Sequence, residues 1–369
     1  MKRFTTIALV ALLAIAALIV PAAAQMDAVE VRSNVYNGTQ AADGISITPA
    51  QFSGFFYDID DNIGSEMLNV TTDGATSRTI PEGNLTYSTA IEQVEYAADF
   101  ASEGTNSNND SYPVLGLFAE KYVATSDTDA GDLVKLLLDS DDKYTLRTGS
   151  ALELPNGYEL TAKQIDVDGN KVWMELSKDG EFIEDEVLNV EGGNAATWTY
   201  DADVGDTDDV IVFRVLVTQV FQGQVDSLAV VEGLYLVDYE DVLSLETGDE
   251  FGELEIDTLS SSIEMSSTGA VTLSRDDTVD IAEGMKFQVA DNSTIRFYVM
   301  KEYTEPGTYE VRGSVATGAA TWTPASFAGF FYDIDDDIGS EELAVLSISG
   351  TRTIPEGNLT YSTAIEQVE

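Results

Sequence analysis

Two short stretches of the chain concentrate the oxygen ligands that hard cations prefer. Each places several acidic side chains just before a glycine, and the six carboxylates of interest are Asp58, Asp60, Asp61, Asp333, Asp335 and Asp336. Such clusters could bind Ca²⁺, which takes several oxygen atoms in a flexible geometry. The spacing differs from an EF-hand, because Gly64 stands at loop position seven and Asn69, rather than Glu, at position twelve. We therefore favour a solvated acidic turn, with a site for a divalent cation as the alternative.

A second kind of candidate site is the Asn-x-Ser/Thr sequon, which can accept N-linked glycan in an exported chain. The motif requires an exposed asparagine whose side-chain amide can reach the glycosyltransferase. Six sequons are present, at Asn37, Asn69, Asn84, Asn109, Asn292 and Asn358. We predict that about half of them carry glycan, since the motif alone is a weak predictor; the others are chance matches. The sugar would hydrate and shield the outer face.

The chain contains no cysteine and no histidine. This absence removes disulfides, the usual metal ligands and the Ser-His and Cys-His forms of catalysis. Paired carboxylates can hydrolyse glycosidic bonds, but among 66 acidic residues suitable pairs arise by chance. Aromatic residues that could line a sugar platform are more often core at strand spacing, and they are Phe55, Phe56, Tyr57 and Trp173. We predict no enzyme, no catalytic residue and no cofactor beyond a divalent cation.

The segments that must position these residues have the composition of β-strands. Thr, Val, Ile, Tyr and Phe dominate them, and Gly, Asp and Asn punctuate them every 8–12 residues. Asp-Gly pairs at 168–169 and 179–180 predict two successive hairpins with two-residue turns. Residues 210–221 predict a central strand buried on both faces, whereas 91–101 and 132–140 could each form a strand or a short helix. The sequence predicts an all-β fold.

A long internal duplication organises the chain. Residues 52–95 recur as residues 327–369 with one residue lost, and eighteen consecutive positions are identical. A match of that length indicates a duplicated unit, here about 275 residues long, which is large enough for one or two domains. We expect residues 306–369 to be the N-terminal portion of a second, truncated repeat. It should either borrow partners from the first repeat or expose strand edges and apolar side chains, including Phe330 and Phe331.

The N-terminus has the pattern of a secretory signal. Lys2 and Arg3 precede an unbroken apolar run at residues 7–20, and three alanines before Gln25 fit a signal-peptidase site. We assign residues 1–24 to this signal peptide and expect no membrane span in the remainder.

Residues 25–305 would form one complete repeat built from two β-sandwiches. Residues 150–238 contain enough strands for one sandwich. The flanking segments 31–149 and 239–305 would form the other, with the first inserted into it. The expected fold is therefore a series of tandem β-sandwich domains.

Acidic residues outnumber basic ones so strongly that whole classes of partner are excluded. The chain has 66 Asp and Glu against 18 Lys and Arg, which gives a formal net charge of −48. The resulting field repels nucleic acid and anionic membrane surfaces. The apolar content of 44% is too high for a disordered acidic tail. We expect a folded protein whose acidic surface suits an ion-rich exterior.

Several motifs, in one order along the chain, resemble the duplication domain of surface-layer (S-layer) proteins from methanogenic archaea. They are KQIDVDGNKVWMELSKDGEFIEDEVL (163–188), VTQVFQGQVDSLAVVEGLYL (217–236), GDEFGELEID (248–257), ADNSTIRFYVMKEY (290–303) and the repeated GFFYDIDD with TIPEGNLTYS. The resemblance covers one whole repeat and the start of a second, and it implies tandem β-sandwiches, two per repeat. Full-length members are similar in carrying two repeats, a Thr-rich tether and a C-terminal membrane helix. This sequence has neither the tether nor the helix, so how it would be anchored stays open.

The resemblance implies a structural protein of the archaeal cell surface that is secreted and self-associates into a porous surface layer. Carboxylates around the pores would favour cations and small neutral solutes and repel polyanions, so the layer would be a protective coat and a charge-selective sieve. A secreted adhesin or carbohydrate-binding β-sandwich module is the alternative, and an exposed row of aromatic residues on one sheet face would favour it. A carboxylate-based hydrolase would need a cleft that holds a carboxyl group of strongly raised pKa.

Overall fold

The computed structural model of the protein describes residues 29–100, 111–190, 194–304, 309, 311–350 and 352–367. The predicted signal peptide and the sequon at Asn109 lie outside these ranges. Within them the chain is almost entirely β-structure, and the paired strands are antiparallel. The all-β fold that the sequence predicts is confirmed.

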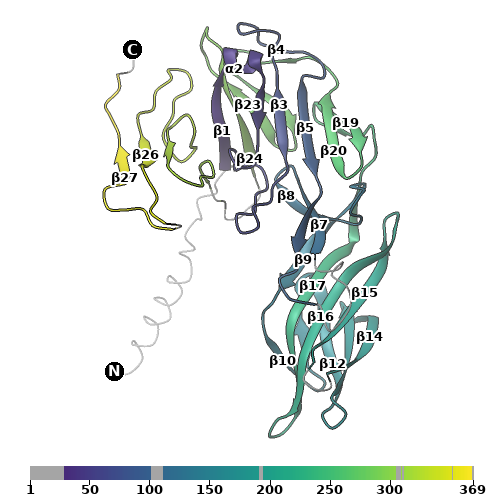
Figure 1. Ribbon diagram of the computed structural model, residues 1–369. Helices are drawn as coiled ribbons and strands as arrows, with labels where there is room; N and C mark the ends of the chain where they lie inside the picture. Colours follow the sequence, from purple (N-terminus) through teal and green to yellow (C-terminus); the bar gives the residue numbers. More distant parts are fainter. Residues whose placement is uncertain are drawn as a thin grey trace, which may run out of the picture.

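Two sheets face each other in the upper half of Figure 1. The β1 sheet runs in the order β1 (Val29–Asn37), β24 (Arg296–Tyr303), β23 (Met285–Val289) and β22 (Asp277–Ala282). The β5 sheet runs in the order β18 (Glu250–Phe251), β19 (Leu254–Leu259), β20 (Ser262–Ser267), β5 (Leu85–Ala90), β3 (Met67–Val70) and β2 (Ile45–Ile47). At the top lie helix α2 (Gly38–Asp43) and the short pair of β4 (Thr79–Ile80) and β21 (Val271–Thr272).

A long sheet runs from the middle of the molecule into the lower half of Figure 1. Its order is β15 (Ala196–Val204), β16 (Thr207–Gln222), β17 (Ser227–Ser244), β9 (Asp132–Ser140), β8 (Glu120–Ala124), β7 (Ser111–Leu117) and β6 (Glu92–Glu95), and β10 (Tyr144–Arg147) also pairs with β17. The β12 sheet packs against its lower part and consists of β11 (Ala151–Glu153), β12 (Tyr158–Asp166), β13 (Lys171–Lys178) and β14 (Glu181–Asn189), with the 3-10 turn η1 (Pro155–Gly157) between β11 and β12. The two segments that could have been strand or helix are the strands β6 and β9.

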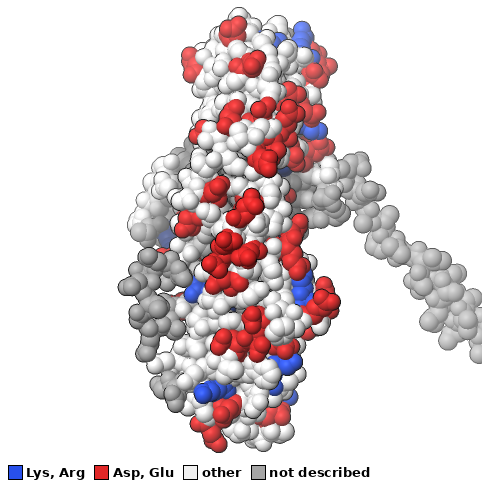
Figure 2. Space-filling model, turned by 90° about the vertical axis from the view of Figure 1, so that its right-hand side faces the viewer, with Lys and Arg blue, Asp and Glu red and all other residues white. Residues whose placement is uncertain are grey.

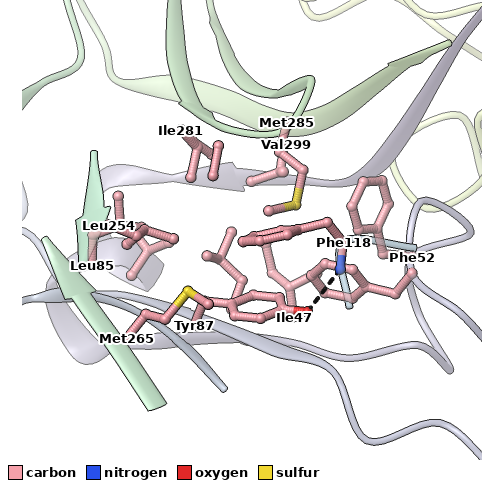
Figure 3. Packing of buried hydrophobic residues seen from close by; sticks show 14 of the residues in the cluster. Ile47, Phe52, Leu85, Tyr87, Phe118, Leu254, Met265, Ile281, Met285 and Val299 are labelled. Carbon is pink, nitrogen blue, oxygen red and sulfur yellow. Dashed lines mark hydrogen bonds between the residues drawn. The ribbon is translucent and has the colours of Figure 1, made fainter. Parts of the chain in front are cut away.

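Alternation along the strands creates the core between the β1 and β5 sheets. In β5, Leu85 and Tyr87 are fully buried and the residues between them are half-buried, which is the period of two expected for a strand. The ring of Phe118 stacks on Tyr87 with 4.7 Å between ring centres, and the backbone N–H of Phe118 donates to the Tyr87 hydroxyl at 3.0 Å (Figure 3). Such an aromatic pair contributes about 0.5–1.5 kcal/mol beyond its buried area.

Strand β16 is the central strand that the sequence predicts. Phe213 and Val215 point toward the β12 sheet, whereas Val212 and Leu216 belong to a separate cluster on the other face of the long sheet. All four side chains are buried. A strand covered on both faces needs a near-continuous apolar run rather than alternation, and the sequence has one.

The two predicted hairpins have different loops. Between β13 and β14 the loop has two residues, Asp179 and Gly180, with φ of 51° and 82°, as a two-residue hairpin turn requires. Between β12 and β13, Asp166 pairs with Lys171, so the loop has four residues, 167–170, and the predicted two-residue turn is wrong. The cause is local, because Oδ1 of Asp166 accepts a hydrogen bond from the backbone of Gly169 at 3.0 Å and forms a wider Asx turn.

The start of the second repeat forms a three-stranded sheet beside the β1 sheet (Figure 1). Its strands are β25 (Ala320–Trp322), β26 (Glu342–Val345) and β27 (Leu359–Ser362), which occupy the positions of β2, β3 and β5 in the repeat and keep their register. Tyr361, which corresponds to Tyr87, is 58% exposed, and Phe331 is 68% exposed. The expected exposure is confirmed for Phe331, whereas Phe330, also expected to be exposed, is half-buried and packs against Phe327 and Tyr361.

Candidate functional surfaces

The first acidic loop, residues 58–63, is held by its own hydrogen bonds. Asp58 and Ile63 exchange two backbone hydrogen bonds of 2.8 and 3.0 Å. Oδ1 of Asp58 accepts from the backbone N–H groups of Asp60 and Asp61 at 3.0 and 3.3 Å. The hydroxyl of Tyr57 donates to Oδ1 of Asn62, the residue directly after the carboxylates, at 2.7 Å. One of the three predicted cation ligands therefore already shapes the loop.

The second acidic loop, residues 333–338, repeats this geometry and contacts the first repeat. Oδ1 of Asp333 accepts from the backbone of Asp335 and Asp336 at 3.0 and 3.2 Å. Asp335 in turn accepts from the backbone N–H of Asp291 at 2.6 Å. Nη2 of Arg296, at the start of β24, lies 3.3 Å from a carboxylate oxygen of Asp337. This loop thus joins the repeats.

A divalent cation at either loop stays a prediction. Among the described residues no three acidic side chains come together in a way that could hold an ion. Asp58 and Asp61 line a hollow of about 590 Å³ with Asp139 and Lys121. Burial raises the pKa of Asp139, and the nearby carboxylate of Asp61 raises it further. The ammonium of Lys121, 5.9 Å from the ring centre of Tyr112, places a positive charge in the same hollow.

The sequons differ in how accessible the structure leaves them. Asn37 and Asn84 are exposed, and Asn37 caps helix α2 with its Oδ1. Asn69 is half-buried and donates to the hydroxyl of Thr86 at 3.2 Å. Nδ2 of Asn292 donates to the carbonyl oxygen of Asp335 in the second acidic loop at 3.2 Å. In the second repeat, Asn358 is half-buried, and its Nδ2 donates to the hydroxyl of Ser347 at 2.9 Å.

The aromatic residues singled out in the sequence do not share one environment. Phe55 is in the core, and Phe56 and Tyr57 are half-buried, but Trp173 is 38% exposed and its prediction as a core residue is wrong. Neighbouring residues of β13 point inward, so the alternation of the strand places Trp173 on the outer face of the β12 sheet. There it pairs across the strands with Val187 rather than with a second aromatic residue.

A buried carboxylate that the sequence did not single out lies beneath the first acidic loop. Glu66 is 1% exposed. It accepts hydrogen bonds from the backbone of Phe56, from the Tyr87 hydroxyl at 2.8 Å and from the backbone of Ala119 at 2.9 Å. Burial raises the pKa of Glu66 to about 7, although the three donors and the positive charge of Lys301 oppose the rise. Its three partners join β5, the loop after Phe55 and the β7–β8 turn at one point.

The second repeat has the same carboxylate at its surface. Glu341 accepts from the backbone of Phe331 at 2.9 Å and from the hydroxyl of Tyr361 at 2.7 Å. These two hydrogen bonds lower the pKa of Glu341. The signal available in the sequence was the Gly-Ser-Glu triplet, which occurs at the same place in both copies, at 64–66 and 339–341.

Comparison with known proteins gives the family. The sequence model of the S-layer protein family matches residues 36–291 and 312–369. The chain belongs to the S-layer protein family. It is similar to proteins named Major S-layer protein, with 44% identity over 382 residues in Methanosarcina mazei, 46% over 378 residues in Methanosarcina barkeri and 44% over 387 residues in Methanosarcina acetivorans. Each alignment covers 100% of this chain and 56%, 56% and 57% of the relative, respectively, so the chain spans a little over half the length of these curated relatives.

The surface of this S-layer family member is acidic along its length. Figure 2 shows Asp and Glu side chains spread over one whole face, from one end of the molecule to the other, with few Lys and Arg among them. On this face the acidic side chains are thus distributed along the molecule rather than confined to one segment. No helix within the described ranges is long and apolar enough to span a bilayer.

Proposed function

We propose that this chain is a secreted structural subunit that self-associates into a porous, negatively charged layer on the cell surface. The observation that carries the proposal is the family match over residues 36–291 and 312–369. The name Major S-layer protein, shared by the three Methanosarcina relatives, supports the same role. The layer acts as a protective coat, and its acidic surface (Figure 2) favours cations and neutral solutes over polyanions in the pores.

The buried carboxylate supports a structural role over a hydrolytic one. A carboxylate-based hydrolase needs an accessible carboxyl group of raised pKa. The carboxyl group with a pKa of about 7, that of Glu66, is 1% exposed and accepts hydrogen bonds from three groups of the protein itself. A substrate cannot reach it without opening the core. The chain is therefore not an enzyme that works through this group.

The rigid unit of this layer is a repeat of two β-sandwiches, formed by 31–149 with 239–305 and by the inserted 150–238. The core between the β1 and β5 sheets supports this division, because its residues come from 31–133 and from 245–299. The core under the β12 sheet supports it too, because all of its buried residues except Leu146 come from 154–236. Proteolysis of the native protein should cut first near the crossings between the sandwiches, and fragments ending inside 150–238 would contradict the division.

Labelling of whole cells tests the proposed location. Antibodies against the folded protein should bind intact cells of the source organism, and isolated envelope sheets should contain the chain in amounts that account for a continuous layer. Antibody binding only after cell lysis would contradict the proposal. Recovery of the protein solely from the culture medium would favour a secreted binding module instead.

A further inference from the structure

The two repeats contact each other through pairs of equivalent residues. The backbone N–H of Val35 donates to the carbonyl oxygen of Ala325 at 2.8 Å, and the backbone N–H of Val315 donates to that of Ala50 at 2.8 Å. Ala50 and Ala325 occupy the same position of the repeat, directly after Thr-Pro. Val35 and Val315 also correspond, because each ends a Val-Arg-x-x-Val sequence. Each repeat therefore gives the other the hydrogen bond that it receives.

Arg32, in the Val-Arg-x-x-Val sequence of the first repeat, contacts the second repeat. Nη2 of Arg32 donates to the carbonyl oxygen of Phe327 at 3.2 Å and also to that of Pro324. The guanidinium lies 5.4 Å from the ring centre of Tyr332.

The equivalent arginine makes the same contact in the opposite direction. Nη2 of Arg312 donates to the carbonyl oxygen of Phe52 at 3.2 Å, and its guanidinium lies 5.1 Å from the ring centre of Tyr57. Phe52 corresponds to Phe327, the residue that Arg32 contacts, and Tyr57 corresponds to Tyr332. The backbone hydrogen bonds, the arginine contacts and the contacts with an aromatic ring are thus each made in both directions. This reciprocity is the property of an isologous interface.

We propose that this pairing surface, formed by residues 31–35 and 48–57, is self-complementary, and that it also binds the same surface on the first repeat of a second copy of the chain. Residues 48–58 and 323–333 differ at only two positions, so the first repeat already presents the groups that it contacts on the second. Within one chain the second repeat occupies the surface because the short connection gives it a high effective concentration. Displacing the second repeat frees the surface for another chain.

In a pair of first repeats, one contact that occurs once within a single chain would form twice. Arg296 contacts the second acidic loop, where Asp335 also accepts from the backbone of Asp291. The first repeat has both Arg296 and an acidic loop with Asp60 at the position of Asp335, so a symmetric pair can form this contact twice. Asn62 stands where the second loop has Asp337, so the ion pair becomes a neutral hydrogen bond.

The test uses the full chain and changes only the second repeat. Arg312→Glu removes one arginine, and Tyr332→Arg places a like charge beside Arg32, so the double variant disengages the second repeat and leaves residues 29–304 unaltered. At dilutions where the unaltered chain sediments with the mass of one chain, the double variant should sediment as a concentration-dependent dimer of twice that mass. Adding Arg32→Ala should restore the single-chain mass, because it removes the arginine that the new pair needs.

Hydrogen exchange at the amide of Val35 decides between the remaining outcomes. A double variant that keeps the single-chain mass and loses protection at Val35 would show that the surface does not bind another copy. Retained protection at Val35 in a single-chain species would show that the two arginine contacts do not form the pairing surface, which contradicts the surface as proposed. A dimer that survives Arg32→Ala would place the new interface elsewhere. Each of these three results overturns the proposal.

Discussion

The hydroxyl of Tyr87 donates to Glu66 at 2.8 Å inside the core, and the equivalent Tyr361 donates to Glu341 at 2.7 Å at the surface. The two pairs have the same residue types at the same positions of the repeat. In the first repeat Phe118 and the β1 sheet cover the pair, whereas nothing in the described part of the second repeat does so. The chain therefore contains the same Tyr–Glu pair once buried and once exposed. Comparison of the two pairs isolates the effect of burial on the pKa of the glutamate.

The buried pair predicts a pH-dependent stability. Because burial raises the pKa of Glu66 from an ordinary 4.5 to about 7, the native state keeps a proton that the unfolded state loses between those values. The contribution of Glu66 to the free energy of unfolding therefore falls as the pH rises through this window, by about 3 kcal/mol in all, and is constant above it. The free energy of unfolding in urea should be measured for the natural chain and for Glu66→Gln across this pH window. The difference between the two proteins should change by this amount from one end of the window to the other.

Glu341→Gln is the matched control for that measurement. Glu341 is at the surface and its hydrogen bonds lower its pKa, so the substitution should leave the pH dependence between 4.5 and 7 unchanged. Unfolding curves for the natural chain and Glu66→Gln that stay parallel across this range would contradict the assignment of the raised pKa to Glu66.

Engineered disulfides test whether the contact between the repeats is reciprocal. The chain has no cysteine of its own, and the two backbone hydrogen bonds of 2.8 Å make the members of each pair direct neighbours, the proximity on which a disulfide depends. Val35→Cys with Ala325→Cys, and separately Ala50→Cys with Val315→Cys, should each form a disulfide within one chain on oxidation. Single-cysteine variants are the controls. Closure of one pair but not the other would disprove reciprocity.

Glycan occupancy should follow the hydrogen bonds of each asparagine. Asn37 and Asn84 are exposed, whereas the side-chain amides of Asn69 and Asn292 are already donors to other parts of the protein. We expect glycan at the first two sites and little or none at the other two, and mass spectrometry of glycopeptides from the native protein measures this. Occupancy at Asn292 equal to that at Asn84 would mean that the second acidic loop does not contact the first repeat as described.

The acidic surface predicts selective passage through the layer. Cationic and neutral solutes should cross isolated envelope sheets faster than anionic solutes of the same size, because the carboxylates set the potential in the pores. Salt near 1 M should remove the difference, since it shortens the screening length to about 3 Å. Equal rates for the two charges at low salt would contradict the sieve.

The sequence predicted the fold where the signal is local. The apolar run at 210–221 and the Asp-Gly pair at 179–180 became strand β16 and a two-residue turn. The two-residue turn predicted after β12 is too short, because the hydrogen bond from the backbone N–H of Gly169 to Oδ1 of Asp166 leaves no mark in composition. Strand spacing favours the core for Trp173, but the register of β13 points it outward.

The parts of the site that the sequence did not predict depend on contacts between distant residues. Glu66 is one acidic residue among 66, and only the positions of Phe56, Tyr87 and Ala119 in space distinguish it. The reciprocal contacts of Arg32 and Arg312 join residues that are 295 and 260 positions apart in the sequence. The duplication in the sequence predicts that the two repeats have equivalent surfaces, but it does not predict that these surfaces contact each other.

Electron microscopy of the purified, concentrated mature chain, with and without Ca²⁺, tests the central claim most directly. A structural subunit of a surface layer should form two-dimensional arrays with a regular repeat, and arrays that need Ca²⁺ would make the acidic loops a cation site. Particles of a single small size under every condition, from the chain extended to the length of its Methanosarcina relatives as well as from the chain itself, would contradict the claim.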